Sequence, residues 1–153
     1  MVINIGALKS KNYSLLYKDI SLVASTCQSP VPLKVILETV FLTDEEKIAA
    51  SFIAAEAGAT FVKTCTGFLG GGATAEDVLL MKKTVAYKEG VKVKASAGIR
   101  SFEKCMEMYL AGADRIGTCV ITAHHGYIYM LTQLYRSSGA AIVQNATVAS
   151  GTY

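Results

Sequence analysis

The sequence predicts an α/β fold, a partial (β/α)8 barrel built around a parallel sheet. Short apolar segments alternate with longer amphipathic segments along the chain, and this alternation indicates parallel strands joined by helices. The short segments are apolar on both faces, which is typical of a sheet that is covered on both sides. An Ala-Gly-Ala turn directly before a strand occurs at residues 57–59 and again at 111–113, an offset of 54 residues. That offset corresponds to about two βα units of a barrel.

The first elements are predicted from apolar runs and from one proline turn. A strand is expected at Val2–Ile5, and a helix follows at Tyr13–Ser25. The turn Pro30-Val31-Pro32 leads into a run of strand-forming residues, which predicts a second strand at Leu33–Leu37.

The middle elements carry clearer boundary signals. Thr43, with Glu46 three residues later, forms a capping-box pattern that starts a helix. This helix is expected to run to about Ala57, where Gly58 ends it. The next strand is predicted at Thr60–Lys63.

A glycine-rich loop at Gly67–Gly72 separates this strand from the last elements. Thr74 with Asp77 opens the next helix, which is expected to run to about Tyr87. The remaining elements are a strand at Val91–Ala95, a helix from Ser101 to about Leu110 that Gly112 ends, and a strand at Asp114–Gly117.

Five βα units are a little over half of an eight-stranded barrel, which typically needs about 250 residues. Residues 1–153 are therefore interpreted as a single incomplete barrel domain. Its sheet would have two open edges, and open edges favour pairing between chains, so a homo-oligomer through these edges is considered. An open doubly wound sheet is the alternative, but no GxGxxG motif follows the first predicted strand.

Composition excludes several classes of partner. The net charge of +3 is mild and the basic residues are scattered, so no nucleic-acid partner is expected. No apolar window is long enough for a membrane span and no signal peptide is recognisable. The four cysteines form no CxxC pair, and His124 and His125 are adjacent without nearby ligands. We expect reduced thiols, a cytoplasmic location and neither a metal nor a cofactor.

Two lysines at strand ends are the candidate catalytic residues. Lys63 ends one predicted strand and Lys94 lies near the end of the next, and residues at strand C-termini face the active-site mouth of a barrel. Neighbouring strands are about 5 Å apart, so the two ammonium groups should repel each other. One amine should then lose its proton more easily, as an amine nucleophile requires. The alternative is that each lysine simply extends into solvent at a strand end.

The loops that follow both lysines consist of small residues. Gly67 belongs to the first loop and Gly98 to the second, and Arg100 comes two residues after Gly98. Such loops expose backbone N–H groups and can hold a phosphate, to which Arg100 would add a charge-assisted hydrogen bond. The alternative for Arg100 is an exposed position in the first turn of the following helix.

Several segments resemble the deoxyribose-phosphate aldolase family. Residues 61–68, FVKTCTGF, are similar to the family signature F-[VI]-K-T-S-T-G-[FK], and residues 93–100, VKASAGIR, to V-K-[AP]-[SA]-G-G-[IV]-R. Residues 1–8 and 34–39 resemble the motifs of the fourth and fifth barrel strands. The resemblance extends from Met1 to Thr118, with the motifs in the family's order.

The resemblance implies class I aldolase chemistry without a metal. The family reversibly cleaves 2-deoxy-D-ribose 5-phosphate to glyceraldehyde 3-phosphate and acetaldehyde, in deoxyribonucleotide catabolism. Lys63 would form the Schiff base, and Lys94 would depress its pKa and stabilise charge. The resemblance also places the substrate phosphate on a set of loop residues after the last strands: Gly67, Gly98, Arg100, Ser137, Ser138 and Gly139.

The sequence also departs from the family pattern. In the family pattern, a proton-relaying aspartate would come directly before Met1. The first three strands of the barrel would also precede Met1. Cys65 replaces a serine, and Ala97 replaces a glycine and is expected to crowd backbone near the phosphate. The alternative function is therefore a catalytically inactive barrel fragment, or a module that binds sugar phosphate or pairs with a partner.

Residues 119–136 resemble nothing in the family, and the resemblance to the family sequence continues from Ser137. We interpret this segment as an insertion, for which a retained intron translated in frame is one hypothesis. Its apolar and aromatic residues also suit an amphipathic helix or a partner surface. In either case it separates Ser137 and Ser138 from the strand that would direct them toward a phosphate.

Overall fold

The computed structural model describes residues 1–27 and 30–118 of the chain. The predicted insertion at 119–136 lies outside the described residues. So do three of the predicted phosphate-binding residues, Ser137, Ser138 and Gly139.

The described chain has an α/β fold with a four-stranded parallel sheet in the order β1-β2-β3-β4. Its strands are β1 (Lys34–Ile36), β2 (Phe61–Lys63), β3 (Lys92–Ser96) and β4 (Arg115–Gly117). The last four predicted strands are thus confirmed, and each neighbour in sequence is also a neighbour in the sheet. This is the arrangement that successive βα units produce.

The helices are α1 (Ile5–Lys9), α2 (Tyr13–Thr26), α3 (Asp44–Glu56), α4 (Ala75–Val85) and α5 (Phe102–Leu110), with a 3-10 turn η1 (Thr39–Phe41) after β1. The predicted caps are confirmed: the side chains of Thr43, Thr74 and Ser101 each accept a hydrogen bond from the backbone N–H three residues later. At Thr43 the carboxylate of Glu46 completes the capping box.

The predicted strand at Val2–Ile5 is wrong in its extent. Only an isolated parallel bridge joins Val2 to Ile36, with backbone hydrogen bonds from Ile3 N to Ile36 O and from Ile36 N to Met1 O. The Asn4 side chain accepts a hydrogen bond from Ala7 N and starts α1 at once. An N-cap so close to the bridge leaves no residues for a longer strand.

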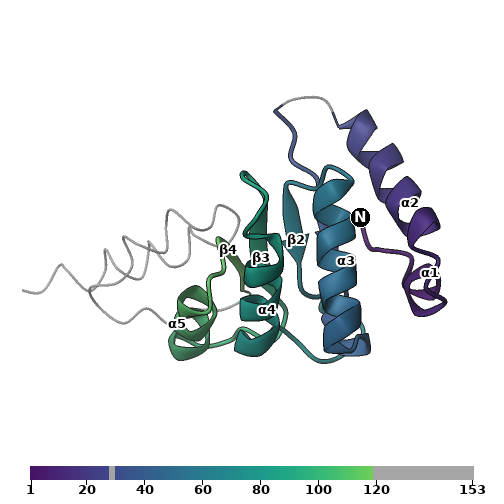
Figure 1. The fold of residues 1–153 in the computed structure, drawn as a ribbon. Coiled ribbons are helices and arrows are strands. Elements are labelled where there is room, and N and C mark those ends of the chain that lie inside the picture. Colours follow the sequence, from purple (N-terminus) through teal and green to yellow (C-terminus); the bar gives the residue numbers. More distant parts are fainter. Residues whose placement is uncertain (28–29, 119–153) are drawn as a thin grey trace, which may run out of the picture.

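The sheet has two chemically different faces, so the expectation of two apolar faces is wrong. The apolar face is fully buried, and it consists of Val35, Val62, Val93, Ala95 and Ile116. Helices α3, α4 and α5 pack against β2, β3 and β4 respectively, and Figure 1 shows them as a row in front of the strands. The other face carries cationic side chains, which are Lys34, Lys63, Lys92, Lys94 and Arg115.

Helix α4 is shorter than predicted, because it ends at Val85 instead of near Tyr87. The Tyr87 hydroxyl instead donates a hydrogen bond to Glu56 of α3 at 2.8 Å, and its ring stacks on Phe52. Tyr87 thus contacts α3 from the turn that follows α4. No helix in the described ranges is long and apolar enough to cross a membrane.

Candidate functional site

The two candidate lysines lie side by side, Lys63 at the C-terminal end of β2 and Lys94 in the middle of β3. Lys63 and Lys94 are directly paired in the parallel register, as the order of the strands predicted. Neither is fully buried, and both side chains belong to the cationic face. The Lys94 side chain extends over β4, because a Cβ on Gly117 would lie 3.4 Å from Lys94 Cε. Gly117 therefore leaves the space that Lys94 occupies.

Burial and repulsion both act on these amines. Burial lowers the pKa of Lys63, and the cation of Lys34 lowers it further, while Glu38 and Cys65 act in the opposite direction. Burial also lowers the pKa of Lys94, with further lowering by Lys63, Lys34 and Arg115. Since a neutral amine is the nucleophilic form, the site favours amine chemistry. Among the described residues, no carboxylate forms an ion pair with Lys63.

The loops after β2 and β3 are joined by buried polar side chains. The Thr64 hydroxyl donates to Ser96 O at 3.0 Å and accepts from Ser96 N at 3.0 Å. The Ser96 hydroxyl donates in turn to Cys65 O at 2.7 Å. Buried hydrogen bonds of this kind fix geometry because an unpaired polar group there would be costly. They hold the strand ends of both lysines in one arrangement.

The two glycine loops meet directly beyond these strand ends. Gly67 and Gly98 both have positive φ, and Ala73 N donates to Ala97 O at 2.9 Å. A Cβ on Gly72 would lie only 2.7 Å from Ala97 O, so this approach requires glycine. Gly67 lies beside Ala97, and Gly98 lies beside Gly72, while their role in phosphate binding stays a prediction. Arg100 is exposed and precedes Ser101, the N-cap of α5, so it does not belong to the first helical turn.

Ala97 has a left-handed backbone with φ of 75°. Its Cβ would lie 3.3 Å from a Cβ placed on Gly67, so the methyl group does occupy space between the two loops. The sequence signal was the alanine in a run where the family has glycine. The structure adds that the backbone here is one that alanine adopts only at a cost.

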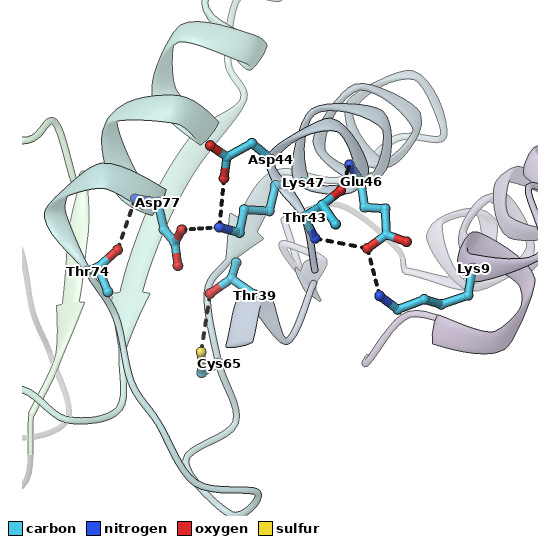
Figure 2. Close-up of polar contacts among 9 residues, drawn as sticks. All are labelled: Lys9, Thr39, Thr43, Asp44, Glu46, Lys47, Cys65, Thr74 and Asp77. Atoms are coloured by element: carbon cyan, nitrogen blue, oxygen red, sulfur yellow. Dashed lines mark hydrogen bonds and ion pairs between the residues drawn. The ribbon is translucent and has the colours of Figure 1, made fainter. Parts of the chain in front are cut away.

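A second polar cluster fixes the N-termini of α3 and α4 at the same end of the sheet. The ammonium group of Lys47 forms ion pairs with Asp77 at 2.7 Å and Asp44 at 2.9 Å, as Figure 2 shows. Burial opposes the charge, but the hydrogen bonds to both carboxylates outweigh it and raise the pKa of Lys47. Thr39 of η1 contacts Cys65 Sγ at 3.4 Å.

Sequence reasoning missed Glu38, which lies at the end of β1. Its carboxylate accepts a hydrogen bond from Thr66 N, with distances of 3.0 Å to Oε1 and 3.3 Å to Oε2. The side chain is completely buried and the residue has a left-handed backbone, with φ of 59°. The available signal was a carboxylate directly after an apolar strand. Among the described residues, no group of three or more His, Cys, Asp or Glu side chains is placed to hold a metal ion.

The known proteins that this chain resembles are deoxyribose-phosphate aldolases. The chain is 58% identical over 118 residues to the deoxyribose-phosphate aldolase of Streptococcus sanguinis, covering 77% of the chain and 52% of that protein. It is 58% identical over 119 residues to the enzyme of Methanothermobacter thermautotrophicus, covering 77% and 51%. The chain thus spans about half the length of the curated relatives it matches. No protein-family model matches it.

Solved structures give the same result. A structure assigned as a deoxyribose-phosphate aldolase from Coccidioides immitis superposes with a TM-score of 0.74 at 44% identity, over 77% of this chain and 47% of that one. The deoxyribose-phosphate aldolase of Aeropyrum pernix, described as a tetramer, superposes with a TM-score of 0.64 at 33% identity, over 69% and 45%. The four-stranded sheet therefore matches part of the aldolase fold.

Proposed function

The chain is a homologue of the deoxyribose-phosphate aldolases over about half their length. We propose that it carries the two lysines of their catalytic site, Lys63 and Lys94. The reaction would be the reversible cleavage of 2-deoxy-D-ribose 5-phosphate to glyceraldehyde 3-phosphate and acetaldehyde. The observation that supports this proposal most directly is the register pair Lys63–Lys94, with the pKa of both amines lowered first by burial.

In this proposal Lys63 is the nucleophile. Its neutral amine attacks the substrate aldehyde, and loss of water leaves an iminium ion that accepts the electron pair of the breaking carbon–carbon bond. Lys94 would keep positive charge close to the reacting centre. It lies two residues before Ser96, whose hydrogen bonds to Thr64 and Cys65 fix this part of β3. Burial and the cation of Lys34 favour the neutral form of Lys63, and in this proposal a cation at Lys94 would add to that effect.

The substrate phosphate would bind at the joined glycine loops. Gly67 and Gly98 belong to loops that contact each other through Ala97 and Gly72, and Arg100 is exposed two residues after Gly98. Ser137, Ser138 and Gly139 complete the proposed phosphate site from outside the described residues. The strands correspond in this proposal to the later strands of a barrel, within a single incomplete domain and with an insertion at residues 119–136. The chain would form an oligomer, as the tetrameric Aeropyrum pernix relative does. We further propose that it acts in the cytoplasm.

The test is reductive trapping on the full chain. The protein is incubated with acetaldehyde, treated with borohydride and mapped by peptide mass spectrometry, and we expect a reduced adduct on Lys63. Lys63→Ala should remove the adduct completely. Lys92→Ala, which removes an exposed lysine from β3, is the matched control and should leave the adduct in place.

The alternative is a non-catalytic chain that binds sugar phosphate or pairs with a partner. It is favoured by Ala97, whose methyl group lies beside Gly67 in the proposed phosphate site on a backbone with φ of 75°. A folded sample that gives no adduct on Lys63 would contradict the aldolase proposal and support this alternative.

A further inference from the structure

We propose that Glu38 is a positioning residue for the lysine site, holding the loop after Lys63 in place and supplying the carboxylate that balances a cation on the Lys63 amine. This inference rests on the proposed function for its catalytic meaning. Its structural basis is the placement of a completely buried carboxylate between β1 and the loop that follows β2.

The first observation is the hydrogen bonding of the Glu38 side chain. Its carboxylate accepts from Thr66 N, three residues after Lys63, at 3.0 and 3.3 Å. The backbone adds two further contacts, because Glu38 N and Thr39 N both donate to Thr64 O, at 2.8 and 3.2 Å. The segment that leaves Lys63 is thus fixed from the β1 side, while Ser96 fixes it from the β3 side.

The second observation is the backbone of Glu38. Its φ and ψ are both 59°, in the left-handed region that residues other than glycine seldom adopt. Such a conformation persists only where the surroundings enforce it, and it is concentrated at functional sites. A glycine would satisfy the backbone alone. The glutamate is therefore explained by its carboxylate, which accepts the hydrogen bond from the Thr66 amide.

The third observation is electrostatic. The charged or titratable groups that act on Lys63 are Glu38 after β1, Lys34 on β1 and Cys65 in its own loop, and Lys63 in turn acts on Lys94 on β3. Among these, Glu38 is the carboxylate, and it raises the pKa of Lys63 against the effect of burial. A negative charge here also stabilises the iminium ion that Lys63 would form. It compensates for the neighbouring cations without forming an ion pair with Lys63 in the described structure.

Two variants separate the effect of the Glu38 charge from the effect of its hydrogen bond to Thr66 N. Glu38→Gln keeps an oxygen that can accept from Thr66 N but removes the charge, and Glu38→Ala removes both. Glu89→Gln is the matched control, because it removes an exposed carboxylate from the turn before β3. Lys63 reactivity is measured by pulse acetylation with peptide mass spectrometry between pH 6 and about pH 10, with the exposed Lys92 as internal reference. Thr66 is followed by amide hydrogen exchange.

We expect the Lys63 acetylation profile of Glu38→Gln to move to lower pH, with about three- to tenfold faster labelling near neutral pH. Thr66 exchange should stay within about threefold of the parent protein in Glu38→Gln and rise at least about tenfold in Glu38→Ala. Glu89→Gln should match the parent chain in both measurements.

Either of two results would overturn the inference. One is a Lys63 profile that does not move in folded Glu38→Gln, and the other is unchanged Thr66 exchange in Glu38→Ala. If Glu38→Ala does not fold, the profile of Glu38→Gln still decides. Because acetylation needs no aldehyde chemistry, failure of the aldolase proposal appears separately, as absence of the borohydride adduct in the parent chain.

Discussion

The apolar face and the cationic face of the sheet are built from alternate residues of the same four short strands. On β3, Val93 and Ala95 are completely buried, whereas Lys92 is exposed and Lys94 is half-buried between them. Strand geometry sends successive side chains to opposite faces. A strand of only a few residues therefore stabilises the fold with one set of side chains and places amines on the opposite face with the other.

The two faces differ in what determines their energy. On the apolar face, removal of surface from water is worth roughly 25 cal/mol per Å², and tight packing adds to it. On the cationic face, burial disfavours the charged amines and lowers the pKa of both Lys63 and Lys94. The first face stabilises the fold. The second face opposes folding, because burial of the two charged amines costs free energy and lowers their pKa.

The largest expected effect breaks the packing on the apolar side. Met81 of α4 is fully buried, while Leu79 of the same helix is 44% exposed. Met81→Ala should lower the free energy of unfolding by about 2–5 kcal/mol, because it leaves a cavity. Leu79→Ala, the matched control, should lower it by less than about 1 kcal/mol. Chemical denaturation of the full chain measures both, and equal losses would contradict the assignment of this face as the core.

The sequence was sufficient for the parts of the fold that depend on local signals. The caps at Thr43, Thr74 and Ser101 and the proximity of Lys63 to Lys94 follow from short patterns and from strand order. The strand at Val2–Ile5 failed because Asn4 supplies a competing local cap. An apolar run alone does not reveal which of these two local preferences will prevail.

The polar interior of the site could not be predicted from the sequence. Glu38, Thr64 and Ser96 are buried by partners about thirty residues away, as in the hydrogen bond from Ser96 N to Thr64 at a separation of 32 residues. Threonine and serine are usually exposed, so nothing local marks them as anchors. Their role becomes visible only when parallel pairing brings the strand ends together.

An intermediate effect concerns strain at the site end of the sheet. Ala97 has φ of 75°, a conformation that costs an L-residue about 1–2 kcal/mol and glycine almost nothing. Ala97→Gly should therefore raise the free energy of unfolding by about 1 kcal/mol after the entropy of the unfolded glycine is included. It would also clear the methyl group that lies close to Gly67.

The control for this strain is an alanine with ordinary helical dihedrals. Ala86 is exposed at the end of α4, with φ of −60° and ψ of −25°, so Ala86→Gly should destabilise the chain by about 0.5–1 kcal/mol. Opposite signs at Ala97 and Ala86 in urea unfolding would establish the strain. If Ala97→Gly is as destabilising as Ala86→Gly, the left-handed backbone at position 97 is not costly in this chain.

The smallest expected effect tests whether the cationic face opposes folding. The pKa of Lys94 is lowered in the folded chain, by burial first and then by its cationic neighbours, so the unfolded chain binds more protons between that lowered pKa and 10.5. Wild-type stability from this residue therefore increases as pH rises through that interval. Lys94→Met keeps a similar length but carries no charge. At neutral pH it should be more stable than the parent by under about 1 kcal/mol, because a half-buried charge stays partly solvated. This advantage should shrink as the pH approaches 10.5.

Lys92→Met, which removes an exposed cation from the same strand, gives the baseline for the comparison. If Lys94→Met is instead less stable than the parent at neutral pH and the deficit persists at high pH, the Lys94 side chain supports the fold through packing, and the two faces of the sheet differ less in their energetic roles than their charges indicate.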